Sequence, residues 1–312
     1  MKLAPTSVRG IMLAVSVALL PGIALQAWQF GPAVWLQTGW CTLFALLLEA
    51  LCLRLRQLPV RQGLSDFSWL VCGLLLGQAL PLMVPAWMML VAALVALGLT
   101  KHASGGLGQN RLNPVMAGLG VIAVCFYQQL YPAPSAQLPW TQGLSIQQVL
   151  AQQWLLEPRL QLDSLSGATP LAHDQLADAS PYVAWIGYLA GGLLLVLLRV
   201  IRLEIPLAMA ASSVLLCILA GHPPLEALYS LTLGGFIFAA FFIATDPVTS
   251  PDSRFGRILF GAAIGAITEL VREFGLYADG LCFAVLAGNL LVTQLDALSR
   301  RLFQPWYRVK MN

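Results

Sequence analysis

Residues 11–28 read IMLAVSVALLPGIALQAW and contain no charged side chain. An apolar run of this length can cross the hydrocarbon core of a bilayer as an α-helix. A lone strand there would leave its backbone groups unpaired, and the run lacks the alternation of a membrane-barrel strand. The stretch therefore predicts a membrane-spanning helix.

The same stretch also has features of a secretory signal peptide, because Lys2 and Arg9 precede its apolar residues. It is long for a signal peptide, however, and contains Pro21. It also leads into a second apolar run without a clear small-x-small cleavage site. We therefore interpret it as the first retained span.

Further apolar runs follow along the whole chain. The runs are 11–28, 33–53, 66–80, 82–100, 114–131, 181–199, 205–220, 225–244, 257–273 and 279–298. Only Pro81 separates the third from the fourth, so one long bent hairpin would also fit there. The 312 residues are 58% hydrophobic and 10% charged, with a mean hydropathy of +0.77, whereas a soluble domain carries about 25% charged residues. We expect an all-α polytopic membrane protein with about ten transmembrane helices.

The basic residues predict the orientation of these helices. With ten spans and a cytoplasmic N-terminus, fifteen of the 17 basic residues fall on the inside: Lys2, Arg9, Arg54, Arg56, Arg61, Lys101, Arg111, Arg199, Arg202, Arg254, Arg257, Arg300, Arg301, Arg308 and Lys310. Only Arg159 and Arg272 fall outside. By the positive-inside rule, both termini are expected in the cytoplasm of a bacterium, and the 132–180 loop in the periplasm beyond its inner membrane. The net charge of +3 reflects this membrane face and gives no argument for a nucleic-acid partner.

Five runs precede the long loop and five follow it. We therefore divide the chain into a first membrane half (1–131), a periplasmic loop (132–180) and a second membrane half (181–312). An odd number of spans makes the two halves enter the membrane from opposite sides, as in inverted-repeat transporters. Glycine-rich stretches at 105–108 and 275–280 precede the last span of each half. We expect an inverted repeat.

Two connections between the runs carry polar motifs. The segment 101–114 is glycine-rich and ends in Asn113-Pro114, which suits the cap and first turn of a helix. It could instead line a site for a phosphate or another polar ligand, although it matches no phosphate-binding fingerprint. The second connection, 245–251, reads TDPVTSP, and Asp246 near the bilayer edge could cap a short helix or serve a function.

The remaining reactive residue types are scattered. Glu49 lies near the end of the second run, and Glu269 and Arg272 share a helix face as a charge pair or as part of an ion path. The six cysteines lie in spans without a Cys-x-x-Cys pair, and the three histidines lie in separate connections. We therefore expect no metal site and no iron–sulfur cluster. No nucleophile–base arrangement of a catalytic residue is readable.

The long loop contains the stretch 163–169, DSLSGAT, which ends in a hydroxyl with little steric cover. Pro170 biases Thr169 toward an extended conformation. A slim, extended peptide of this kind can enter the active site of another enzyme. The residues of the motif are Asp163, Ser166, Gly167, Ala168 and Thr169. The stretch therefore predicts a modification site at Thr169.

This stretch resembles the acceptor pattern of flavinylated proteins, Asp-x-x-Ser/Thr-Gly-Ala-Thr/Ser. Together with Pro170-Leu171 it is similar to the motif of two related membrane families, the D subunit of the Rnf electron-transport complex and the B subunit of the sodium-translocating NADH:quinone reductase. The resemblance extends to 105–114 and to 242–251, so that with the ten-span layout it covers almost the whole chain. The first span begins near residue 11, without the longer N-terminal extension of the quinone-reductase subunit, which favours the Rnf D subunit.

The resemblance implies FMN held covalently through a phosphoester on Thr169, attached by a periplasmic flavin transferase that recognises Asp163. It also implies a complex with other membrane subunits that moves electrons between ferredoxin- and NAD-linked partners and translocates Na⁺ or H⁺. Asn113, Thr245 and Asp246 are weaker candidates for a pore or ring pocket between the two halves. Two other interpretations stay open, a flavin-free channel or transporter with the same layout and a scaffold subunit that anchors redox partners.

Overall fold

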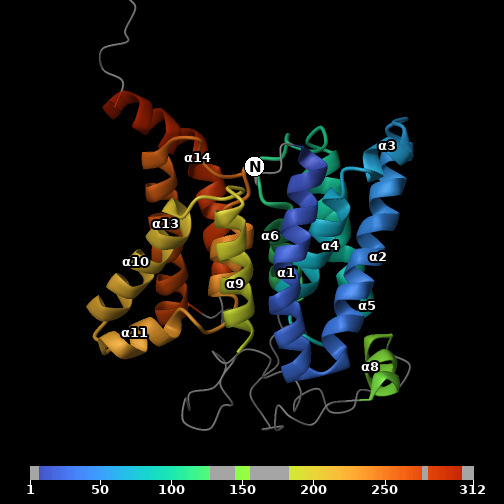
Figure 1. Cartoon of the computed structure of the whole chain (residues 1–312), viewed down its shortest axis with the longest axis horizontal. Coiled ribbons are helices and arrows are strands. Elements are labelled where there is room, and N and C mark those ends of the chain that lie inside the picture. Colours follow the sequence, from blue (N-terminus) through green and yellow to red (C-terminus); the bar gives the residue numbers. More distant parts are fainter. Residues whose placement is uncertain (1–6, 127–144, 155–182, 276–279, 304–312) are drawn as a thin grey trace, which may run out of the picture.

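The computed structural model describes residues 7–126, 145–154, 183–275 and 280–303. In these ranges the regular structure is entirely helical, which confirms the predicted all-α class (Figure 1). The first group of helices is α1 (Val8–Phe30), α2 (Pro32–Leu55), α3 (Val60–Leu64), α4 (Ser68–Ala79), α5 (Ala86–Ala93), η1 (Leu94–His102) and α6 (Pro114–Cys125). The short helix α8 (Ile146–Gln153) follows. The second group is α9 (Ala184–Leu197), α10 (Glu204–Leu219), α11 (Pro224–Ser230), α12 (Phe236–Phe238), η4 (Ala239–Ile243), α13 (Arg254–Phe274) and α14 (Leu281–Phe303).

Local chemistry sets several of these helix ends. Ser7 caps α1 by accepting a hydrogen bond from the Gly10 amide, and the helix ends at Gly31, whose φ of 75° suits a residue without a Cβ. Pro32 then opens α2 at a position where no backbone donor is needed. The expected cap of the fifth run is also present, since the Asn113 side chain accepts from the first amides of α6.

The predicted spans do not all appear as long helices. In the described ranges, three helices are long and apolar enough to cross a membrane by length and composition: α1, α2 and residues Leu281–Leu302 of α14. Shorter apolar helices occupy Ser68–Ala79, Ala86–His102, Pro114–Cys125, Ala184–Leu197 and Glu204–Leu219. The ten-span count and the inverted repeat therefore stay predictions.

The eighth predicted span, 225–244, is wrong as one continuous helix. The structure divides it into α11, a turn over residues 231–235, and α12 followed by η4. Gly234 has a φ of 60° in that turn, a backbone conformation that an α-helix does not contain. The hydropathy pattern does not reveal this break, because the residues on both sides of it are apolar.

The two groups of helices stand side by side in Figure 1, with α1–α6 on one side and α9–α14 on the other. They meet where α1 packs against α9 and where α6 packs against α14. Along α9, an added Cβ on Gly191 would collide with the carbonyl of Ala18, and one on Gly187 would lie 2.5 Å from the carbonyl oxygen of Pro21. The backbones of α1 and α9 are therefore in direct contact.

Large apolar side chains cover the outside of both groups. Trp28, Leu197 and Phe274 are each more than 70% exposed, among many other exposed aliphatic and aromatic residues. Exposure of such an apolar surface to water is unfavourable, whereas contact with lipid chains is not. The exposed surface thus agrees with the membrane class predicted from composition.

Candidate functional site

A cavity of about 250 Å³ lies between the two groups of helices. Its walls come from α1, α4, η1, α6, α9 and η4, and from the connections that follow η1 and η4. All three predicted pocket residues, Asn113, Thr245 and Asp246, line it although about 130 residues separate the first from the other two. Phe241 and Phe242 supply aromatic surface to the same cavity. The structure therefore brings these candidates together, while their roles remain predictions.

Asn113 connects three parts of the chain at the edge of the cavity. Its side-chain oxygen accepts from the amides of Val115 and Met116 at 3.1 and 3.2 Å, which caps α6. Its own backbone amide donates to Asn289 Oδ1 on α14 at 2.8 Å. Asn289 in turn donates from Nδ2 to the carbonyl of Thr249 at 2.9 Å. These contacts bind the cap of α6 to α14 and to the connection after η4.

Thr245 and Asp246 satisfy much of their hydrogen bonding within their own turn. The Thr245 hydroxyl donates to the Phe241 carbonyl at 2.6 Å. The Asp246 carboxylate accepts from the Val248 amide at 3.2 Å and from the Thr249 hydroxyl at 3.0 Å. Burial raises the pKa of Asp246, which lies just beyond the eighth predicted span, and these two hydrogen bonds act in the opposite direction. The structure thus does not show the helix cap considered for Asp246, because residues 247–249 form a turn and the next helix, α13, begins at Arg254 with Ser253 as its cap. Asp246 closes this turn and also lines the cavity.

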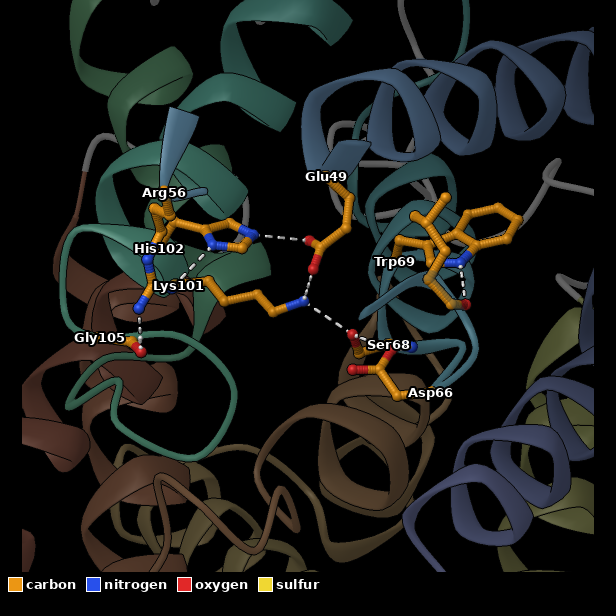
Figure 2. Close-up of polar contacts among 9 residues, drawn as sticks. Glu49, Arg56, Asp66, Ser68, Trp69, Lys101, His102 and Gly105 are labelled. Atoms are coloured by element: carbon orange, nitrogen blue, oxygen red, sulfur yellow. Dashed lines mark hydrogen bonds and ion pairs between the residues drawn. The ribbon is translucent and has the colours of Figure 1, made fainter. Parts of the chain in front are cut away.

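A buried charged cluster reaches the cavity wall through Lys101 and Ser68. Lys101 Nζ on η1 lies 2.7 Å from Glu49 Oε1 on α2 and donates to the Ser68 hydroxyl on α4 at 2.7 Å (Figure 2). His102 Nε2 lies 3.1 Å from Glu49 Oε2. Glu49, Lys101 and His102 are only 2%, 4% and 8% exposed. Buried charges of this kind need partners, and here the partners come from three separate helices.

The contacts of His102 specify its tautomer. Arg56 NH1 lies 3.2 Å from His102 Nδ1, and a guanidinium can only donate. His102 Nδ1 must therefore accept, so that the ring proton is on Nε2, facing Glu49. Arg56 also donates from NH2 to the Gly105 carbonyl at 2.8 Å, which connects the glycine-rich segment to this cluster (Figure 2).

Both connections that carry polar motifs follow π-helical segments. η1 ends at His102, the second residue of the 101–114 segment, and η4 ends at Ile243, two residues before Thr245, where the Thr-Asp-Pro stretch begins. Within η1, the Thr100 hydroxyl donates to the carbonyl of Val95, five residues earlier. π-Helical turns are rare and occur often at functional sites. Their position here agrees with a site between the two connections.

The predicted flavin-acceptor residues lie outside the described residues. Asp163, Ser166, Gly167, Ala168 and Thr169 all fall within 155–182. Their assignment therefore continues to rest on the sequence motif. In the described ranges, no group of three or more His, Cys, Asp and Glu side chains could hold a metal ion.

Sequence reasoning missed several residues in and behind the cavity wall. It noted Glu49 and Lys101 separately but did not pair them, since they are 52 positions apart in the sequence. A signal existed, because each places a charge at the end of a long apolar run, where a buried partner is expected. Asn289 carried a similar signal as an amide inside the last run. Ser68 carried none.

Comparison with known proteins agrees with these observations. The D subunit of the ion-translocating oxidoreductase complex of Yersinia enterocolitica is 37% identical, over 93% of this chain and 92% of the relative. The D subunit of the same complex from Cronobacter sakazakii is 36% identical, over 93% of this chain and 93% of the relative. The D subunit from Tolumonas auensis is 37% identical, over 94% of this chain and 94% of the relative. The model of one family matches residues 3–303, which confirms the resemblance seen in the motifs. The chain thus belongs to the NQR2, RnfD, RnfE family.

Proposed function

We propose that this chain is the FMN-carrying membrane subunit of an Rnf-type electron-transport complex. It passes electrons between ferredoxin- and NAD-linked partners, and the complex couples this transfer to the translocation of Na⁺ or H⁺. The observation that carries the proposal is the acceptor motif 163–169 in a chain of this family. The relatives, each named as the D subunit of an ion-translocating oxidoreductase complex, support the role as one subunit among several.

Thr169 is the proposed attachment residue. Its hydroxyl can form a phosphoester with FMN, and the small residues Gly167 and Ala168 leave it accessible to a periplasmic flavin transferase. Asp163 is proposed to form part of what the transferase recognises. The bound flavin supplies the redox chemistry, while Thr169 serves as its tether and the protein sets its surroundings.

The predicted layout of ten spans in two inverted halves is part of this proposal. In such folds, short or interrupted spans at matching positions of the two halves mark the transport site. The third predicted run of the first half corresponds to α4, a helix of 12 residues. The third run of the second half is the one interrupted between α11 and α12. The proposal includes the inverted repeat at these positions. It also includes a bacterial inner-membrane location, cytoplasmic termini and a periplasmic 132–180 loop, for which the distribution of the basic residues is the support.

The cavity supports a role for Asn113, Thr245 and Asp246 as a pore or ring pocket. It lies between the two helix groups and combines these polar groups with the aromatic side chains of Phe241 and Phe242. A few placed polar groups within a mostly apolar wall are typical of ligand sites. We propose that the site serves ion passage or the packing of a ring.

Mass spectrometry of the protein from its native membrane tests the proposal. The 160–180 peptide should carry the mass of an FMN phosphoester localised to Thr169, and the denatured band should fluoresce under ultraviolet light. Thr169→Ala should abolish the fluorescence, whereas Ser164→Ala, which removes a hydroxyl at a free position of the motif, should retain it. An unmodified peptide from cells that contain the transferase would refute the flavin assignment and favour a flavin-free channel or a scaffold subunit.

A further inference from the structure

A continuous series of polar contacts leads from the surface of the protein to the cavity. It begins at the exposed Arg56, which contacts His102 Nδ1 at 3.2 Å. It continues from His102 Nε2 to Glu49 Oε2, which lie 3.1 Å apart without hydrogen-bond geometry, so that a small turn of the ring is needed to aim the proton. From Glu49 Oε1 it continues to Lys101 Nζ through a hydrogen bond of 2.7 Å. Lys101 itself lines the cavity. Arg56 directly follows α2, whose end lies beside α3, at the end of the bundle opposite α8 (Figure 1).

Three of the groups in this series, His102, Glu49 and Lys101, can each hold and release a proton. A histidine with one bare and one protonated nitrogen can take a proton on one side and give one on the other. A carboxylate between an imidazole and an ammonium can accept from either of them. We propose that His102, Glu49 and Lys101 form a proton relay between the surface at Arg56 and the cavity, so that the ion handled in the cavity is a proton.

The proposed transfer balances as follows. Lys101 gives one proton to the occupant of the cavity, a water molecule or another acceptor, and becomes a neutral amine. A proton from bulk water binds His102 Nδ1 when Arg56 moves aside, which gives an imidazolium. The imidazolium passes its Nε2 proton to Glu49, and Glu49, after its carboxyl group turns, passes a proton to Lys101. The ring is then protonated on Nδ1 alone. The starting tautomer returns by exchange with water, in which Nδ1 releases its proton and Nε2 takes one up, and Arg56 favours that tautomer because it can donate only to a bare Nδ1.

The surrounding charges favour a proton over a metal cation on this wall. A metal cation would meet the Lys101 ammonium, whereas oxygen ligands are what hard cations require. Other titratable groups near the cluster are Asp66, whose carboxylate accepts from Ser68, and Cys52 and Cys72 on α2 and α4. Asp246 lines the same cavity from the connection after η4, with its carboxylate bonded within its own turn.

The chain offers a direct way to observe this relay. It contains three lysines, of which Lys2 and Lys310 lie near the two ends. Lys2→Arg and Lys310→Arg leave Lys101 as the single lysine of the full-length protein. In proteoliposomes of ¹⁵N-lysine-labelled protein, solid-state NMR then follows the replacement of the Lys101 ammonium protons after transfer into D₂O.

Two variants in this background test the path. His102→Gln keeps a donor and an acceptor but cannot relay a proton, and it should slow the exchange at Lys101 at least tenfold. Arg56→Met is an exposed change that leaves Nδ1 open to water, and it should speed the exchange several-fold. His222→Gln makes the same chemical change at a distant histidine and Glu269→Gln neutralises another buried glutamate, so both should leave the rate unchanged.

The results can contradict the relay in two ways. Equal rates in the starting protein, His102→Gln and Arg56→Met would show that protons reach Lys101 only through the cavity. Protection of the Lys101 protons in the starting protein would show that no path is open.

The importance of the relay for ion translocation rests on the proposed function, which the mass of the 160–180 peptide tests separately in the same preparation. Modified Thr169 with His102-independent exchange would overturn the relay alone. Unmodified Thr169 with His102-dependent exchange would overturn the flavin role and leave the relay standing.

Discussion

The two groups of helices meet in two chemically different ways. Between α1 and α9, small residues allow backbone contact, so that Gly187 and Gly191 lie directly on the carbonyls of Pro21 and Ala18. Where η1 and α6 of the first group face η4 of the second, the two groups of helices are separated by a cavity of about 250 Å³ whose wall includes Lys101. We call the first the tight contact and the second the open contact.

The difference follows from how helices associate without water. In a membrane, tight helix pairs depend on close approach of small residues, which leaves no room for a ligand. Polar groups that stay bonded to one another can instead hold helices together around a space. In the open contact, Asn113 bonds to Asn289 across the two groups, and on the side of the first group Lys101 in the cavity wall bonds to Glu49 behind it. The tight contact should therefore respond to volume and the open contact to charge and hydrogen bonding.

The largest effect is expected for Lys101→Met in the open contact. The change leaves Glu49 buried without its cation, and breaking a buried pair costs about 3–5 kcal/mol. Thermal unfolding in detergent micelles should show this loss as a lower melting temperature. Adding Glu49→Leu to Lys101→Met should recover most of the stability, since no buried charge is then unpaired. A double variant as unstable as the single one would show that the cation has another role.

A smaller effect is expected for Gly191→Ala in the tight contact. The added methyl group would meet the Ala18 carbonyl, and overpacking of this kind costs about 1–3 kcal/mol. Gly39 on α2 is the matched control, because an added Cβ there has nothing within 4 Å. Gly39→Ala should be neutral or stabilising by up to about 1 kcal/mol, as alanine favours a helix. Equal unfolding temperatures for both variants would contradict direct backbone contact between α1 and α9.

Much of the helical fold could be predicted from local sequence. The apolar run 11–28 indicated α1, and Asn113-Pro114 indicated the start of α6, because capping and hydrophobic length are local properties. The break in 225–244 could not be seen, since hydropathy does not distinguish a helix from an apolar turn at Gly234. The π-helical geometry of η1 was equally hidden, because its sequence remains a continuous apolar run up to Lys101.

A still smaller effect is expected for Asn113→Ala at the edge of the cavity. The variant removes the acceptor that caps α6, and loss of a cap costs about 0.5–2 kcal/mol. Asn113→Asp keeps a side-chain acceptor and should retain most of the stability. Ser253→Ala removes the cap of α13 and provides a comparison on another helix. If Asn113→Asp unfolds as easily as Asn113→Ala, the cap is not what stabilises this edge.

Less of the site than of the fold could be predicted. Asn113, Thr245 and Asp246 were found because each belongs to a readable connection motif, and they do line one cavity. The pairing of Glu49 with Lys101 depends on how α2 and η1 pack, which no local pattern specifies. Thr169, the proposed acceptor residue, is the opposite case, since its motif is readable but it lies outside the described residues.

The smallest effect is expected at a histidine away from both contacts. His222 Nε2 lies 3.1 Å from Glu273 Oε2, and Nδ1 lies 3.7 Å from Glu226 Oε2. The hydrogen bond with Glu273, followed by the charges of Glu273 and Glu226, raises the pKa of His222 above its ordinary value of 6.5. The protonated form is therefore more stable in the folded protein than in the unfolded one.

This stabilisation should be fully present below pH 6.5 and disappear as the pH rises through the raised pKa of the folded state. Because His222 is 42% exposed, the gain should be at most about 0.5 kcal/mol. Unfolding temperatures of the wild type and His222→Gln should differ at pH 5.5 and converge at pH 9. A difference that persists at high pH would assign the effect to packing. His222 and Lys101 both have a glutamate partner, but only Lys101 is buried. A small loss of stability in His222→Gln together with a large loss in Lys101→Met would therefore show that burial of the charges makes the open contact sensitive to charge.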